Sequence, residues 1–278
     1  MIQIENLTYR YNRKKKLFSG LNLQMPAGKV YGMLGKNGAG KSSLIKNIAG
    51  FLFPTNGSCK VNGREPRRRE TAFLEQLFFI PEECELPALT ITEFIKVYAP
   101  FYPAFDKEQF LHYLDVFHVE PNSHLSQLSF GQKKKTYIGF ALAANTKLLI
   151  MDEPTNGLDI PSKLQFRNIV SNANREDKIT IMSTHQVRDL DDLISSIIIM
   201  DNSEVLLYAD KTEIGEKLYF ETFSKMPPDI PVLYSEQTPN GIAVIALNEQ
   251  HRESYLDIEI LFNATLSVPE QMRSVFMN

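Results

Sequence analysis

The spacing of hydrophobic residues changes along this chain, and each change predicts a type of element. Ile2, Ile4 and Leu7 alternate with polar residues, which is typical of an antiparallel strand, and a second strand-like stretch covers residues 17–25. Continuous short apolar runs, typical of buried strands, follow at residues 30–34, 77–80 and 148–151, and a further strand is predicted at residues 179–183. The pattern therefore predicts a core built on β-sheet.

Helical spacing occurs between these runs. Residues 43–49 place their apolar side chains on one helical face. Further on, Thr90 can cap a helix with Glu93 three residues later, and Asp106 starts another helix. We therefore predict an α-rich insertion within an α/β core. The aromatic elbow at residues 101–105 is either the core of this insertion or a docking surface.

The last part of the chain predicts smaller elements. Residues 231–247 read as a hairpin around an Asn240-Gly241 turn, and residues 257–262 read as a helix. No residue of this tail indicates a reaction, so a regulatory role and simple packing both remain open.

Composition limits the class of protein. With 278 residues the chain can bury one large core, and a net charge of −3 gives no overall attraction to nucleic acid or acidic lipid. No apolar run approaches the roughly 18–20 residues of a membrane span, and the start lacks a signal-peptide pattern. Two cysteines, Cys59 and Cys84, cannot form a disulfide framework, which favours a reducing cytoplasm. A membrane role therefore requires a partner.

The glycine-rich segment after residues 30–34 fits the phosphate-binding pattern G-x-x-x-x-G-K-[ST]. Glycines let backbone N–H groups turn toward a phosphate chain, and the following helix points its positive end at the same anion. Lys41 is expected to reach the β- and γ-phosphates, and the Ser42 hydroxyl to join a magnesium ion. We assign nucleotide binding to Gly35, Asn37, Gly38, Ala39, Gly40, Lys41, Ser42 and Ser43.

Carboxylates follow two of the apolar runs. Asp152 and Glu153 come directly after residues 148–151, where the buried strand fixes their position. Asp152 can hold a magnesium ion through its water shell, and Glu153 can polarise an attacking water. Glu82 follows residues 77–80, where a polar side chain facing the phosphate loop is well placed for metal or water. A merely exposed glutamate remains the alternative there.

These motifs and those that follow resemble the nucleotide-binding subunit of an ATP-binding cassette (ABC) transporter over about residues 1–210. Residues 128–132, Leu-Ser-Phe-Gly-Gln, are similar to the family's LSGGQ signature, with Phe130 where a glycine is common. Residues 156–159 resemble its D-loop, and His185 resembles its switch histidine. Glu82 departs from the family, which usually has glutamine at this Q-loop position.

The resemblance implies a fold: an α/β P-loop NTPase core of the ABC-ATPase type, with an antiparallel β subdomain and an α-helical insertion at about residues 87–145. It implies an ABC-type ATP-binding domain at residues 1–215 and a small C-terminal hairpin and helix extension at residues 216–278. The activity it implies is ATP hydrolysis with ATP and Mg²⁺, in a bacterial transporter of the export type.

The resemblance also implies residue roles. Glu153 and His185 are expected to be catalytic. Tyr11 matches the family's adenine-stacking aromatic, although a half-buried strand tyrosine is the simpler interpretation. The expected metal ligands are Ser42, Asp152 and Glu82, and the expected further nucleotide contacts are Ser129, Gly131, Gln132 and Asp159.

The implied assembly pairs two ATP-binding subunits head to tail, each ATP lying between one phosphate loop and the other signature. A transmembrane permease subunit would hold the pair at the inner face of the cell membrane, and no nucleic-acid partner is expected. Basic triplets at residues 14–16, 67–69 and 133–135 support the alternative, a soluble ABC ATPase acting on nucleic acid or ribosomes. The presence of Glu153 and His185 disfavours a non-catalytic cassette.

Overall fold

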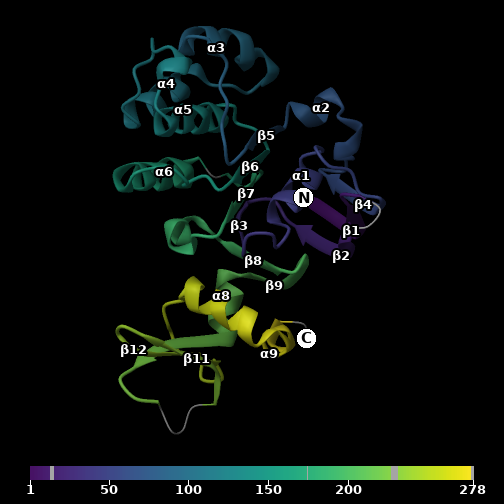
Figure 1. Ribbon diagram of the computed structural model, residues 1–278, viewed down its shortest axis with the longest axis vertical. Coiled ribbons are helices and arrows are strands. Elements are labelled where there is room, and N and C mark those ends of the chain that lie inside the picture. Colours follow the sequence, from purple (N-terminus) through teal and green to yellow (C-terminus); the bar gives the residue numbers. More distant parts are fainter. Residues whose placement is uncertain (13–15, 174, 227–230, 277–278) are drawn as a thin grey trace. The chain divides into compact units, whose positions relative to one another are not determined.

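The chain divides into two compact units. The computed structural model describes residues 1–12, 16–173, 175–226 and 231–276 (Figure 1). The basic triplet at 14–16 therefore lies outside the described residues, apart from Lys16. Unit 1 comprises Met1–Val30 and Ser42–Thr184, and unit 2 comprises Tyr31–Lys41 and His185–Asn278.

Unit 1 contains a three-stranded antiparallel sheet in the order β2-β1-β4. Its strands are β1 (Ile2–Arg10), β2 (Lys16–Met25) and β4 (Asn56–Val61). Ile4 of β1 lies opposite Leu23 of β2 and Cys59 of β4. Because the apolar residues of β1 are buried as their alternation predicted, the antiparallel strand pattern is confirmed.

Three parallel strands of unit 1 are hydrogen-bonded in the order β5-β6-β7: Leu77–Ile80, Leu148–Asp152 and Ile179–Thr184. All but one of their residues are buried, which explains their continuous apolar runs. The neighbouring segments are helical, α1 at Lys41–Ile48 and α6 at Ile160–Asn172. Because parallel strands run in one direction, the polar residues after β5 and β6 leave the sheet at the same edge.

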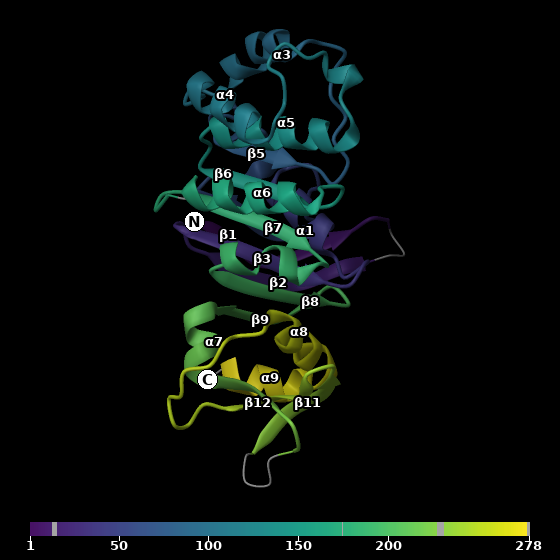
Figure 2. The same cartoon turned by 90° about the vertical axis from the view of Figure 1, so that its left-hand side faces the viewer.

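The predicted helical insertion is present in unit 1, where Figure 2 shows α3, α4 and α5 gathered in one group. Thr90 and Glu93 form the predicted capping box at the start of α3, and Asp106 caps α4. The helices of this part of the chain are α2 (Thr71–Leu74), α3 (Ile91–Tyr98), α4 (Lys107–Val116) and α5 (Phe130–Ala143).

Phe140 of α5 is the centre of an aromatic cluster that joins the insertion to β5. Its ring centroid lies 4.8 to 6.1 Å from those of five rings: Phe78, Phe94, Tyr102, Phe105 and Phe110. The elbow is therefore divided. Tyr102 and Phe105 belong to this core, whereas Phe101 remains 63% exposed.

Unit 2 holds the strand that carries the glycine-rich loop. Residues 31–35 of β3 (Lys29–Gly35) pair in parallel with β8 (Ser196–Asp201). Strand β8 pairs antiparallel with β9 (Glu204–Asp210). The predicted strand at residues 30–34 is thus confirmed, and both β8 and β9 are additions that the sequence interpretation lacked.

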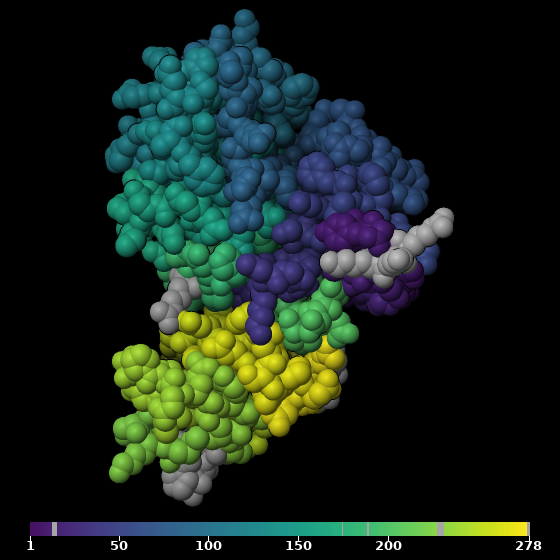
Figure 3. Space-filling model, in the orientation of Figure 1, coloured from purple at the N-terminus to yellow at the C-terminus, as the bar shows by residue number. Residues whose placement is uncertain are grey.

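The C-terminal part of unit 2 contains the predicted hairpin and helix. In the space-filling view of Figure 3, its atoms, coloured yellow-green to yellow, gather together. Thr238 pairs with Gly241, so Pro239 and Asn240 make the turn, one residue earlier than the predicted Asn240-Gly241 turn. The sheet order is β10-β12-β11. The elements are α7 (Lys211–Lys217), β10 (Leu218–Phe223), β11 (Val232–Thr238), β12 (Gly241–Leu247), α8 (Ile258–Ser267) and α9 (Pro269–Phe276).

Short 3₁₀ turns connect several elements: Pro66–Arg68, Ala99–Phe101, Leu125–Gln127, Val187–Asp189 and Asp191–Leu193. Among the helices of the described residues, none has the length and apolar character needed to cross a membrane.

Phe140→Ala is expected to lower the free energy of unfolding by about 3–5 kcal/mol, because it leaves a cavity among five aromatic rings. Denaturant unfolding of the two proteins measures this difference. Phe101→Ala, at an exposed position of the same elbow, serves as the control and should stay within about 0.5 kcal/mol of the parent. Equal losses in the two variants would contradict the division of the elbow.

Candidate active site

The glycine-rich loop leaves β3 and ends where α1 begins. The Lys41 side chain is buried, and its Nζ donates to the carbonyl of Gly35 at 2.6 Å. Gly38 and Gly40 have φ values of +85° and +106°, which favour glycine. A Cβ on Gly35 would stand 2.6 Å from the Met200 carbonyl oxygen, so that position also excludes a side chain. Anion binding by this loop and the amino end of α1 stays a prediction.

A buried carboxylate marks the end of β6. Asp152 is 5% exposed, and its Oδ1 accepts from Ser42 Oγ at 3.2 Å and from Ser183 Oγ. The structure therefore brings together Ser42 and Asp152, two predicted magnesium ligands. The sequence interpretation missed Ser183. The parallel register that places it opposite Asp152 could have indicated it.

Glu153 has an unusual backbone conformation. Its φ is +47°, in the left-handed region that costs a residue with a side chain about 1–3 kcal/mol. The Glu153 N–H donates to the Ser183 carbonyl at 3.0 Å, which helps to hold this conformation. The side chain is 5% exposed. The neighbouring strand β7 thus fixes the residue that we expected to act on water.

Lys134 is a further residue of this region that the sequence interpretation did not single out. It lies on α5, is fully buried, and donates from Nζ to the carbonyls of Glu82 at 2.8 Å and Glu153 at 2.9 Å. Burial lowers the pKa of this ammonium, and the nearby Cys84 thiol and acidic side chains oppose that shift. In the sequence it is only the middle of a basic triplet, so only the fold distinguishes it.

The Glu82 carboxylate is hydrogen-bonded to a partner other than the hydroxyls around Asp152. Its Oε1 accepts from Asn156 Nδ2 at 3.1 Å, and the side chain is exposed. Within the described residues, no hydrogen bond joins it to Ser42, and no group of three or more His, Cys, Asp or Glu side chains is arranged to hold a metal. A magnesium ion usually keeps several waters and needs only one or two carboxylates, so this leaves the Ser42 and Asp152 pair as a fitting site.

Tyr11 lies beside the first turn of α1. Its hydroxyl is 2.6 Å from Ser43 Oγ, and its ring packs edge-on against Tyr9 at 5.2 Å. The ring is 53% exposed, which leaves a face available for stacking. The structure therefore brings Tyr11 to the end of the phosphate loop.

The signature residues are held by local contacts. Ser129 and Gln132 form a reciprocal capping box at the start of α5, and Phe130 is 50% exposed. The Phe130 ring lies against Gly157, where a Cβ would stand 2.3 Å from the ring. A Cβ on Gly131 would stand 3.3 Å from the Gly157 carbonyl oxygen. The signature and the predicted D-loop are therefore in contact.

Two remaining site residues lie at element ends. Asp159 caps α6 by accepting from the Ser162 N–H at 3.0 Å, and its hydrogen bonds with Ser162 lower the pKa of its carboxyl. His185 directly follows β7, belongs to unit 2 and has an exposed side chain. Among the described residues, Asp159 makes no hydrogen bond with Asp152 or Ser42.

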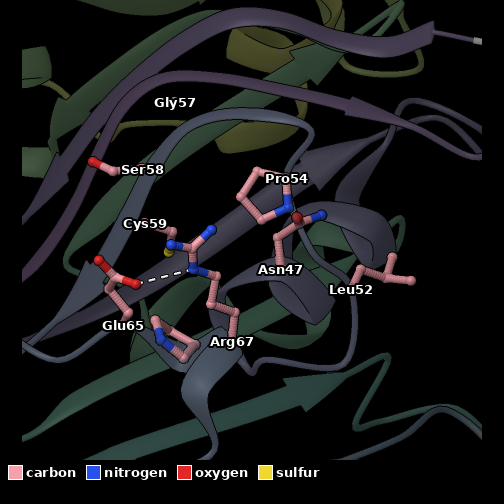
Figure 4. Close-up of a pocket in the computed structure, with 9 residues that line it drawn as sticks. Asn47, Leu52, Pro54, Gly57, Ser58, Cys59, Glu65 and Arg67 are labelled. Atoms are coloured by element: carbon pink, nitrogen blue, oxygen red, sulfur yellow. Dashed lines mark hydrogen bonds and ion pairs between the residues drawn. The ribbon is translucent and has the colours of Figure 1, made fainter.

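A separate pocket lies between α1, β4 and the turn at Pro66–Arg68 (Figure 4). It is lined in part by Asn47, Cys59 and Arg67, and Arg67 Nε donates to Glu65 at 2.9 Å at its edge. Burial raises the pKa of Cys59 to about 12. The volume of this pocket, about 40 Å³, is far below the roughly 300–1,000 Å³ of ligand pockets, so the pocket is too small to be the nucleotide site.

Comparison with known proteins agrees with this geometry. The family described as ABC transporter matches residues 18–156. The lantibiotic transport ATP-binding protein SrtF of Streptococcus pyogenes is 30% identical over 79% of this chain and 96% of its own. The linearmycin resistance ATP-binding protein LnrL of Bacillus subtilis (strain 168) is 28% identical over 81% of this chain and 74% of its own.

A solved structure supports the fold. The dimeric ATP-binding cassette MJ0796, in a post-hydrolysis state with ADP and Pi, superposes with a TM-score of 0.66 at 23% identity, over 76% of this chain and 98% of that one. The chain therefore belongs to the ABC transporter family. It is an ATP-binding subunit that hydrolyses ATP, and the soluble alternative acting on nucleic acid or ribosomes is not favoured.

Proposed function

We propose that this chain uses Glu153 to hydrolyse ATP in a dimer and thereby drives export through a separate permease. The observation that carries this proposal is the Asp152 carboxylate held by Ser42 and Ser183, with Glu153 next to it in a conformation fixed by β7. Ser42 directly follows Lys41, the lysine of the phosphate loop. The Asp152 carboxylate and the phosphate loop are therefore proposed to act on the same bound nucleotide.

Magnesium fits the residues present. Ser42 Oγ and Asp152 Oδ1 are oxygen donors 3.2 Å apart, and oxygen is the ligand that Mg²⁺ prefers. We assign the ion to Ser42 and Asp152, with Glu82 as a further ligand. When bound, it would neutralise charge on the β- and γ-phosphate oxygens.

The remaining steps, nucleotide binding and activation of the attacking water, are assigned to side chains and backbone groups of this chain. Lys41 and the loop residues Gly35, Asn37, Gly38, Ala39, Gly40 and Ser43 hold the phosphates, while Tyr11 stacks on adenine. Glu153 orients the attacking water and accepts its proton, with His185 assisting. No group other than a well-placed carboxylate and a histidine is required for this step.

Two copies complete each site in this proposal. Ser129, Gly131, Gln132 and Asp159 would serve the nucleotide held by a second ATP-binding subunit. Support comes from the dimeric state of the MJ0796 cassette, a solved structure that this chain resembles. The ATP-binding domain is proposed at residues 1–215, with a C-terminal extension at 216–278 whose role is regulation or packing.

Export through a permease is the final part of the proposal. Two relatives are named for linearmycin resistance and lantibiotic transport, which favours a bacterial export system. The permease would hold the subunit at the inner face of the cell membrane. The exposed ring of Phe101 and the Glu82 loop are the proposed contact surface.

Glu153→Gln is expected to slow ATP turnover by about 10²–10⁴-fold, because it removes the base and keeps the side-chain shape. ATP binding should survive, and ATP should then convert the variant from monomer to dimer. Phosphate release and light scattering after size exclusion measure the two effects. Glu108→Gln, an exposed carboxylate on α4, is the control. Hydrolysis at the parental rate in Glu153→Gln would refute the assigned role.

Glu82→Gln tests the third metal ligand. The glutamine oxygen can still accept from Asn156, so a local structural role is preserved while the charge is lost. We expect the magnesium concentration for half-maximal activity to rise by about 10-fold. Asn156→Ala, which breaks the same hydrogen bond but keeps the carboxylate, should leave the titration unchanged. Identical titrations of parent and Glu82→Gln would exclude a metal role.

The permease is tested by purifying tagged chain from detergent-solubilised membranes. A multispanning subunit should co-purify in stoichiometric amount. Phe101→Asp should reduce its recovery without loss of ATP binding, because it places a charge in the proposed contact. Recovery of the chain from the soluble fraction alone, or co-purification with ribosomes, would argue for the alternative.

A further inference from the structure

Lys134 is a fully buried lysine on α5, where most of the other buried residues are apolar. Ile138 and Phe140, which follow it on α5, are buried with it. Removing an ammonium from water is costly unless hydrogen bonds and opposite charges compensate. The structure provides this compensation at two backbone carbonyls, Glu82 at 2.8 Å and Glu153 at 2.9 Å.

These two carbonyls belong to different loops of unit 1. Glu82 follows β5, and Glu153 follows β6. Asn156, three residues after Glu153 in the same loop, also joins them, because it donates from its backbone N–H to the Glu153 carbonyl at 3.3 Å and from Nδ2 to Glu82 Oε1 at 3.1 Å. The result is a closed ring of hydrogen bonds in which Lys134 supplies the charged donor.

The ring acts on a strained residue. The left-handed backbone of Glu153 persists only if its surroundings over-determine it. Its N–H is held by Ser183 at 3.0 Å, and its carbonyl is held by Lys134. Hydrogen bonds from a charged donor are about twice as strong as neutral ones, so Lys134 is a principal restraint on the carbonyl side.

We propose that Lys134 is a positioning residue for ATP hydrolysis, tying the Glu82 loop to the Glu153 backbone so that the Glu153 carboxylate is held for the attacking water. The proposal rests on the assigned role of Glu153. Lys134 itself touches neither nucleotide nor water in this mechanism. It also makes the position of the catalytic carboxylate depend on the Glu82 loop.

The test compares Lys134→Met, which removes the donors, with Lys134→Gln, which keeps two N–H donors. Both side chains are one bond shorter than lysine, so the two variants differ mainly in the presence of the donors. Glutamine is expected to reach only one of the two carbonyls. We expect kcat for ATP hydrolysis to fall roughly 10–100-fold in Lys134→Met and by an intermediate factor in Lys134→Gln. The KM and the Kd for ATP should stay within about twofold of the parent in both variants.

Lys178→Met is the matched control. Lys178 is also a buried lysine of unit 1, but it precedes β7 at the end opposite Ser183, and burial lowers its pKa to about 8. The control removes a buried charge without touching the ring, so its kcat should equal that of the parent. A similar fall in the control would assign the effect to general destabilisation and overturn the proposal.

Each outcome decides the matter. A parental kcat in Lys134→Met, or a loss of ATP affinity equal to the loss of kcat, overturns the positioning role. If Lys134→Met does not fold, Lys134→Gln decides: a lowered kcat at unchanged KM supports the role, and a parental kcat overturns it. Glu153→Gln is measured in parallel. A parental rate there removes both proposals, whereas a slow Glu153→Gln beside a parental Lys134→Met removes only this one.

Discussion

The buried carboxylate of Asp152 is the constraint on which the site depends. An ionised carboxylate with so little exposure needs donors, and the hydroxyls of Ser42 and Ser183 provide them. Ser42 is the second residue of α1, and Ser183 lies on β7. Satisfying this one charge therefore fixes the start of the helix after the phosphate loop against the ends of two strands.

A strained backbone, at Glu153, and a buried charge, on Lys134, lie next to Asp152. Glu153 follows Asp152 with a left-handed backbone, which turns the chain out of β6 at once. The ammonium of Lys134 and the carbonyl of Ser183 hold the two sides of this residue. A rigid placement of the carboxylate is useful in catalysis, because the geometry for attack is then set before substrate binds. The cost of the strain and of the buried lysine is offset within one hydrogen-bonded network.

Local sequence patterns predicted many of the elements, although β8 and β9 were missed. The capping box at Thr90, the buried run of β6 and the hairpin of β11 and β12 are all encoded within a few residues, but the hairpin turn lies one residue before the predicted Asn-Gly pair. The contacts of Ser183 and Lys134 were not predictable in this way, since they depend on strand register and on which face of α5 is buried. Glu82 shows the same limit: its partner, Asn156, is 74 residues away.

The departure at Phe130 shows how the fold accommodates an unusual side chain. A large ring at the first position of α5 needs a neighbour without a side chain, and Gly157 is that neighbour. Gly157 also has a φ of +79°, so backbone conformation and contact both require glycine. The signature and the segment after Glu153 are therefore matched in shape. Because Asn156 in that segment also donates to the Glu153 carbonyl, the aromatic signature residue is linked through two adjacent residues to the carboxylate proposed to act on water.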